Sequence, residues 1–75
     1  MDYRLKLRPS EVKEFVAAAM RSECHIDIST STNRVVDAKS ILGVLGLDLS
    51  GVLTVSVHGY DREFEQYLKR FSMAC

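Results

Sequence analysis

The fold is decided by the stretch VVDAKSILGVLGLDL, residues 35–49. Val35 and Val36 open it, and β-branched residues favour a strand. Asp37 and Ser40 follow, and both are good helix N-caps because their side-chain oxygens accept hydrogen bonds from the free N–H groups of a first helical turn. An apolar run interrupted by two glycines comes next: Ile41, Leu42, Val44, Leu45, Leu47 and Leu49. The stretch therefore predicts a strand that leads into a short helix.

The predicted helix carries more apolar side chains than one buried stripe accommodates. Val44 and Leu47 are expected to pack into the core. Three further side chains cannot all face inward with them: Ile41, Leu42 and Leu45. Part of the apolar surface is therefore predicted to be exposed, and an exposed apolar patch is typical of an interaction site. Each glycine costs about 1 kcal/mol relative to alanine, so packing rather than propensity must hold this helix.

The regions on either side alternate between strand and helix patterns. Alternation of apolar and polar residues predicts strands over 3–7, 25–29, 34–36 and 53–57. Apolar residues at i, i+3, i+4 and i+7 predict helices over 10–21 and after an N-cap at Asp61. The order β-α-β-β-α-β-α predicts an α+β fold, an open-faced β-sandwich. Its four-stranded antiparallel sheet has three helices on one face and water on the other.

Composition restricts the class of protein. Seventy-five residues make one domain, 1–75, and 47% hydrophobic residues indicate a globular fold. Ten basic and ten acidic side chains cancel, which argues against a nucleic-acid partner bound through its phosphates. No apolar run approaches the ~18 residues of a membrane span, and the first residues lack the apolar core of a signal peptide. We therefore expect a cytoplasmic protein with no membrane partner. The two cysteines, Cys24 and Cys75, lack zinc-site spacing, and we expect no metal and no cofactor.

Residues 36–45, VDAKSILGVL, closely resemble the regulatory-serine segment of HPr, the small phosphocarrier of the bacterial sugar phosphotransferase system. The family pattern is roughly V-x-x-K-S-[IL]-[ML]-G-[VL]-[ML]. The match is specific because Lys-Ser, the apolar pair and the glycine share one spacing. The resemblance extends over nearly the whole chain, and it implies the same open-faced β-sandwich that the periodicities predict.

The resemblance fails at the residue that carries the family's chemistry. HPr proteins have a phosphoacceptor histidine just before Ala-Arg-Pro, between the first strand and the first helix. Here that stretch is LKLRPS, residues 5–10. One alignment places Lys6 at the histidine position and the other places Arg8 there. We therefore predict no histidine phosphocarrier activity. The chain's two histidines, His25 and His58, are expected to be solvated and without a role, with rerouted phosphotransfer as the minority alternative.

The resemblance assigns roles to the segment around Ser40. It implies that Ser40 is a regulatory phosphosite for an ATP-dependent serine kinase. The residues themselves predict Ser40 as a helix N-cap, with Lys39 beside it to screen part of the phosphate charge. It also implies that partners dock on an apolar patch with Arg8 at its rim: Ile41, Leu42, Leu45 and Leu47. Arg8 and Ser10, at the start of the first helix, form a weaker candidate for anion binding.

Three functional hypotheses remain open from the sequence. The first is a regulatory or protein-interaction module, not an enzyme, which acts through the Ser40 helix. Its partners are phosphotransferase-system proteins or a serine kinase or transcriptional regulator. The second is a phosphocarrier that uses a non-standard residue. The third is a diverged HPr fold with a private partner.

Overall fold

The structure, a computed structural model, describes residues 1–71. The second cysteine, Cys75, lies outside them. The elements follow in the order β1 (Asp2–Leu5), the short 3-10 helix η1 (Pro9–Glu11), α1 (Val12–Met20), β2 (His25–Ser29), β3 (Val35–Asp37), α2 (Ile41–Leu45), β4 (Leu53–His58) and α3 (Arg62–Leu68). The predicted order of strands and helices is therefore confirmed.

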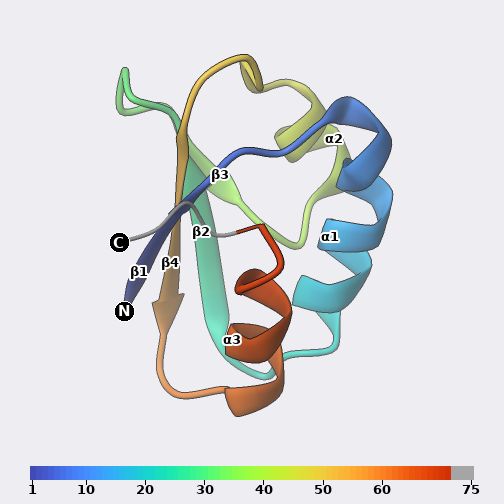
Figure 1. Cartoon of the computed structure of the whole chain (residues 1–75), viewed down its shortest axis with the longest axis vertical. Coiled ribbons are helices and arrows are strands. Elements are labelled where there is room, and N and C mark those ends of the chain that lie inside the picture. The colour runs from blue at the N-terminus through green and yellow to red at the C-terminus, as the bar shows by residue number, and fades with distance from the viewer. Residues whose placement is uncertain (72–75) are drawn as a thin grey trace.

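The strands form one four-stranded sheet in the order β1-β4-β2-β3, and every neighbouring pair is antiparallel. α1, α2 and α3 all lie on the same side of this sheet (Figure 1). The other face carries no helix among residues 1–71. The predicted α+β open-faced β-sandwich is confirmed.

The core lies between the sheet and the helices. Successive side chains of a strand point to opposite faces. In β2, Ile26 and Ile28 are fully buried, while Asp27 between them faces the open side. α1 contributes Phe15, which is also fully buried and lies against Phe64 of α3 with ring centroids 6.2 Å apart. Val44 of α2 packs into the same core.

The first connection differs from the prediction. A helix that begins at Ser10 was expected, but Ser10 lies inside η1, and Arg8 is the residue before this turn. The reason is Pro9, whose fixed φ suits the first position of a helical turn and moves the start upstream. Glu11 completes the turn, because its carboxylate accepts a hydrogen bond from the Arg8 backbone N–H at 2.8 Å.

Two local features fit the chemistry of their residues. Asn33, in the turn between β2 and β3, has a left-handed φ of 66°, which asparagine tolerates better than most residues. Asp61 is the N-cap of α3, since its carboxylate accepts a hydrogen bond from the Phe64 backbone N–H at 3.0 Å.

Candidate functional site

Ser40 is the N-cap of α2 and is the last residue of the connection from β3. Its backbone is extended, with φ −103° and ψ 109°, and its hydroxyl oxygen accepts a hydrogen bond from the Gly43 backbone N–H at 3.1 Å. A Cβ at Gly43 would lie 3.1 Å from the Ser40 Oγ, so a larger residue here would require the serine side chain to shift slightly. Ser40 itself is exposed. The predicted N-cap and an accessible hydroxyl therefore coexist in one side chain.

α2 presents an apolar surface to solvent. Leu42 is 80% exposed, Leu45 49% and Ile41 40%. Val44, in the same helix, is fully buried. Leu47 is only 6% exposed, so its assignment to the docking patch is wrong: it packs into the core. We call the three exposed side chains of α2 the α2 patch.

The connection between β1 and α1 lies beside the α2 patch. Pro9 faces the end of α2 across a shallow hollow, whose other lining residues are Leu45, Leu47, Asp48, Leu49 and Ser50. The Arg8 side chain is 80% exposed. The structure therefore brings Pro9, the neighbour of Arg8 in a distant part of the sequence, to the region of the α2 patch.

The predicted anion site at Arg8 and Ser10 already contains an anionic group of the chain. Glu11 accepts the Arg8 backbone N–H, and its Oε2 lies 3.4 Å from the Arg8 guanidinium. The hydrogen bond from the Arg8 backbone, followed by that from its side chain, holds the pKa of the Glu11 carboxyl below its usual value. A free phosphate would have to compete with this carboxylate, so the geometry does not favour the anion site.

Lys39 does not screen the Ser40 side chain as the sequence suggested. Its ammonium group donates a hydrogen bond to the Ser22 carbonyl at 2.8 Å, in the connection between α1 and β2. Its backbone N–H donates to the Asp37 carboxylate, also at 2.8 Å. Lys39 therefore ties two loops together.

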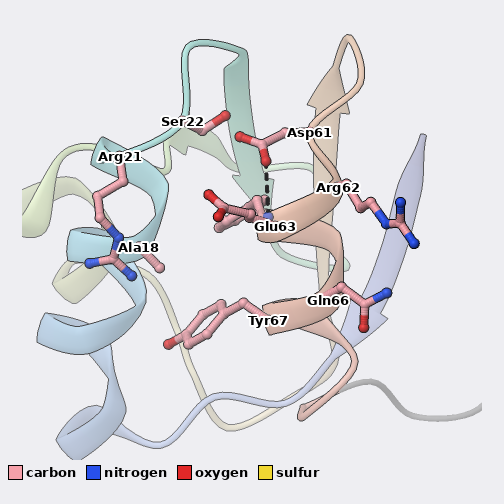
Figure 2. Close-up of a pocket in the computed structure, with 9 residues that line it drawn as sticks. Ala18, Arg21, Ser22, Asp61, Arg62, Glu63, Gln66 and Tyr67 are labelled. Carbon is pink, nitrogen blue, oxygen red and sulfur yellow. Dashed lines mark hydrogen bonds between the residues drawn. The ribbon is translucent and has the colours of Figure 1, made fainter.

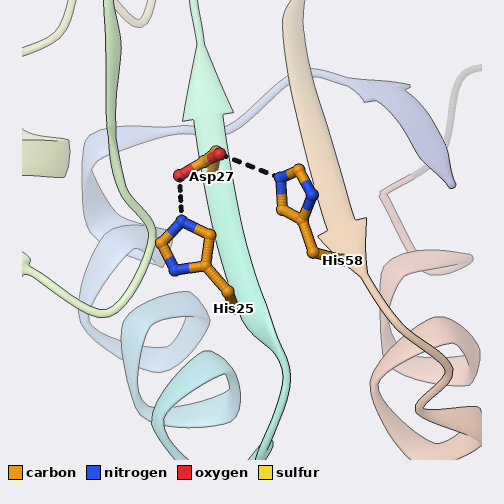
Figure 3. Close-up of side chains that lie close together, drawn as sticks. All are labelled: His25, Asp27 and His58. Carbon is orange, nitrogen blue, oxygen red and sulfur yellow. Dashed lines mark hydrogen bonds and ion pairs between the residues drawn. The ribbon is translucent and has the colours of Figure 1, made fainter.

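The histidines lie on the open face of the sheet. His25 begins β2 and His58 ends β4, and the two residues are directly opposite each other across the strands. Both imidazoles reach toward Asp27 (Figure 3), and each places its Nε2 3.0 Å from a different carboxylate oxygen. These three residues form a group of potential metal ligands. Both histidines are exposed, as predicted, but the sequence analysis did not foresee that they share one carboxylate. The expectation of no metal stays a prediction.

The sequence analysis missed this cluster because one of its three residues, His58, is far from the other two in the sequence. The pattern H-x-D at 25–27 places two polar groups on one face of a strand, as period two requires. The partner, His58, becomes visible only when the pairing of β2 with β4 is known.

A further hollow lies between the end of α1 and the start of α3 (Figure 2). It is lined by Ala18, Arg21, Ser22, Asp61, Arg62, Glu63, Phe64, Gln66 and Tyr67. The Ser22 hydroxyl, and then the Phe64 backbone N–H, donate to Asp61 and hold the pKa of its carboxyl below the usual value. The predicted site residues do not line this hollow, and two of its polar residues, Ser22 and Asp61, belong to the cap of α3.

Among residues 1–71, no helix has both the length and the apolar character that crossing a membrane requires.

The one-sided antiparallel sheet and the serine-capped, exposed helix define the class: a small open-faced β-sandwich of the phosphocarrier type. The model of the family described as "PTS HPr component phosphorylation site" matches residues 4–72, and the chain belongs to this HPr family of the phosphotransferase system. It is similar to a solved structure, the phosphocarrier protein HPr from Bacillus anthracis str. Ames, with 25% identity and a TM-score of 0.70. That match covers 97% of this chain and 96% of the other. Nothing among the curated proteins matches the chain.

Proposed function

We propose that this HPr-family chain is a regulatory or protein-interaction module that acts through Ser40 and the α2 patch, and that it is neither a histidine phosphocarrier nor an enzyme. The observation that carries the proposal is the exposure of the α2 patch beside an accessible Ser40, with Leu42 80% exposed. A side chain of this size in that position contributes nothing to the core. It suits a partner that covers it.

Phosphorylation of Ser40 fits the local geometry. A phosphate there adds nearly two negative charges and three strong acceptor oxygens. The Gly43 N–H, now bonded to the hydroxyl at 3.1 Å, is available to a phosphate oxygen. The helix is therefore expected to survive the modification, while the potential around the α2 patch becomes negative. With Lys39 bonded elsewhere, Arg8 is the cationic group that the proposal places at the rim.

The kinase experiment tests the modification. The chain is incubated with ATP and an HPr-type serine kinase, and the product is mapped by mass spectrometry. One acid-stable phosphate on Ser40 is expected. Ser40→Ala should remain unmodified, and the exposed turn variant Ser31→Ala should be modified like wild type. A wild-type chain that the kinase leaves unmodified would contradict the proposal.

The α2 patch is tested with a matched pair of variants. Leu42 and Met20 are both exposed apolar side chains on helices, at 80% and 64%. Leu42→Lys should lower the rate of Ser40 phosphorylation more than about tenfold, the scale of losing a central interface contact. Met20→Lys should change it by less than about twofold. Equal effects of the two variants would show that the α2 patch is not part of the docking surface.

The second candidate function is phosphotransfer through a non-standard residue, with His25 or His58 as the acceptor. The structure offers both imidazoles, but each faces the Asp27 carboxylate at 3.0 Å, which would repel a phosphoryl group. Incubation with phosphoenolpyruvate and enzyme I of the phosphotransferase system separates the two functions. We expect no acid-labile phosphate, and its appearance would replace the first proposal with the second.

The proposal assigns the chain a set of partners and a location. The partners are phosphotransferase-system proteins, a serine kinase or a transcriptional regulator, without a nucleic acid or a cofactor. A kinase that uses ATP acts in the cytoplasm, so the proposal places the chain there.

A further inference from the structure

The open face of the sheet is organised in rows that cross the strands. Residues opposite each other in an antiparallel pair point to the same face. One row is formed by His58 of β4 and His25 of β2. The next row crosses all four strands: Asp2, Ser56, Asp27 and Asp37. The two imidazoles therefore stand beside a row that contains three carboxylates.

The ligand atoms of His25, Asp27 and His58 converge. The Nε2 atoms of the two imidazoles are each 3.0 Å from a carboxylate oxygen of Asp27, and the three ligand atoms all lie within 4.8 Å of one another. Bonds of about 2.0–2.1 Å in a tetrahedral zinc site place neighbouring ligand atoms about 3.3 Å apart. Small side-chain rotations thus suffice to place one ion among the three groups.

The surrounding charge favours a cation. Asp27 and Asp37 are directly opposite each other on β2 and β3, an arrangement of like charges that destabilises a sheet. Asp37 bonds to the Lys39 backbone N–H, and Asp27 faces the two histidines. A bound cation would relieve the repulsion between the two carboxylates.

We propose that His25, Asp27 and His58 bind a divalent first-row transition-metal ion on the open face of the sheet. Two imidazoles and one carboxylate suit zinc and its neighbours rather than magnesium or calcium, which prefer oxygen ligands. The side chains of the two histidines are 62% and 55% exposed, so an ion held here keeps a coordination position open to water or to a ligand from a partner. The site faces away from the helices, and it does not depend on the proposed function of α2.

The experiment is a titration of the untagged chain with Zn²⁺, followed by calorimetry. Both cysteines are replaced by serine in every protein. Thiol groups bind zinc, and Cys24 directly precedes His25, so its thiol could bind Zn²⁺ in place of the proposed site. One ion per chain is expected, with no competition from excess Mg²⁺. His25→Asn, His58→Asn and Asp27→Asn should each weaken binding more than about tenfold.

The matched control is Asp48→Asn. It removes an exposed carboxylate from the turn between α2 and β4, and it should leave Zn²⁺ affinity within about twofold of the cysteine-free parent. A second measurement needs no variant in the site. In the NMR spectrum of the parent chain, Zn²⁺ should shift the imidazole C–H resonances of both histidines together. Loss of binding in the cysteine-free parent, or retention of affinity in His58→Asn, would overturn the proposal, as would unshifted imidazole resonances.

Discussion

At the scale of single residues, Ser40 is the most informative position. Its hydroxyl is exposed, yet it also accepts the Gly43 N–H that would otherwise lack a partner in the first turn of α2. The same atom therefore connects the stability of the helix with the proposed modification.

Ser40→Ala should lower the free energy of unfolding by about 1 kcal/mol, within the range of about 0.5–2 kcal/mol for loss of an N-cap. Urea unfolding measures this change. Ser31→Ala, in the exposed turn between β2 and β3, serves as the control and should stay within about 0.5 kcal/mol of wild type. Equal stability of the two variants would show that the cap contributes nothing.

We expect Asp61 to make the stability of the chain sensitive to acid. Its carboxyl has a lowered pKa in the folded state, because Ser22 and the Phe64 N–H stabilise the charged form. The resulting stability is present above the unfolded pKa of about 3.9, and it is lost as the pH falls through the folded pKa. Asp61→Asn keeps a capping oxygen but does not titrate.

Urea unfolding at pH 7 and pH 3 tests this dependence. The loss of stability between the two pH values should be smaller in Asp61→Asn than in wild type. It should not vanish, because Glu11 and Asp48 also have lowered pKa values. An equal loss in the two proteins would assign the acid sensitivity to other groups.

At the scale of elements, two glycines at element ends behave oppositely. Gly46, at the end of α2, has φ −78° and ψ −7°, and an added Cβ would meet its nearest neighbour, the Leu42 carbonyl oxygen, at 3.4 Å. Gly59, after β4, has φ 134°, and its Cβ would lie 2.9 Å from the Cys24 Sγ. Of these two glycines, only Gly59 is required by the fold.

Gly46→Ala should therefore raise the free energy of unfolding by about 0.4–1 kcal/mol, because it restricts the unfolded chain without straining the folded one. Gly59→Ala should lower it by about 1–3 kcal/mol, since alanine cannot adopt that backbone without strain. Thermal and urea unfolding of both variants measure the difference. Destabilisation by Gly46→Ala would mean that the end of α2 has another conformation.

At the scale of the whole molecule, the position of a leucine decides its effect. A chain of this length has a total stability of about 4–11 kcal/mol, at about 0.05–0.15 kcal/mol per residue. Leu5 of β1 is fully buried, and Leu42 of α2 is 80% exposed. The same substitution therefore tests the core at one position and the surface at the other.

Leu5→Ala should cost about 2–5 kcal/mol and bring the chain close to unfolding. Leu42→Ala should stay within about 0.5 kcal/mol of wild type. Circular dichroism during urea unfolding measures both. A large loss in Leu42→Ala would show that the side chain packs against the molecule and is unavailable to a partner.

Local sequence patterns were enough to predict the order of the elements and their inward faces. Apolar periodicity of two or 3.6 residues is local, so Ile26 and Ile28, or the alternation in β4, identify a buried face without knowledge of the partner strands. Ser40 and Asp61 were identified as N-caps for the same reason, because a cap involves residues three positions apart.

Contacts between groups that are distant in the sequence could not be predicted from local patterns. Leu47, which follows α2, packs into the core and therefore does not belong to the exposed docking patch to which the resemblance assigned it. Lys39 bonds to the Ser22 carbonyl, and His58 reaches the pair formed by His25 and Asp27, through contacts that no local pattern records. These contacts depend on strand register. The pairing of β2 with β4 sets which side chains lie opposite each other. That pairing is determined by the burial of one face of the sheet, because a shift of one residue would expose the apolar side chains.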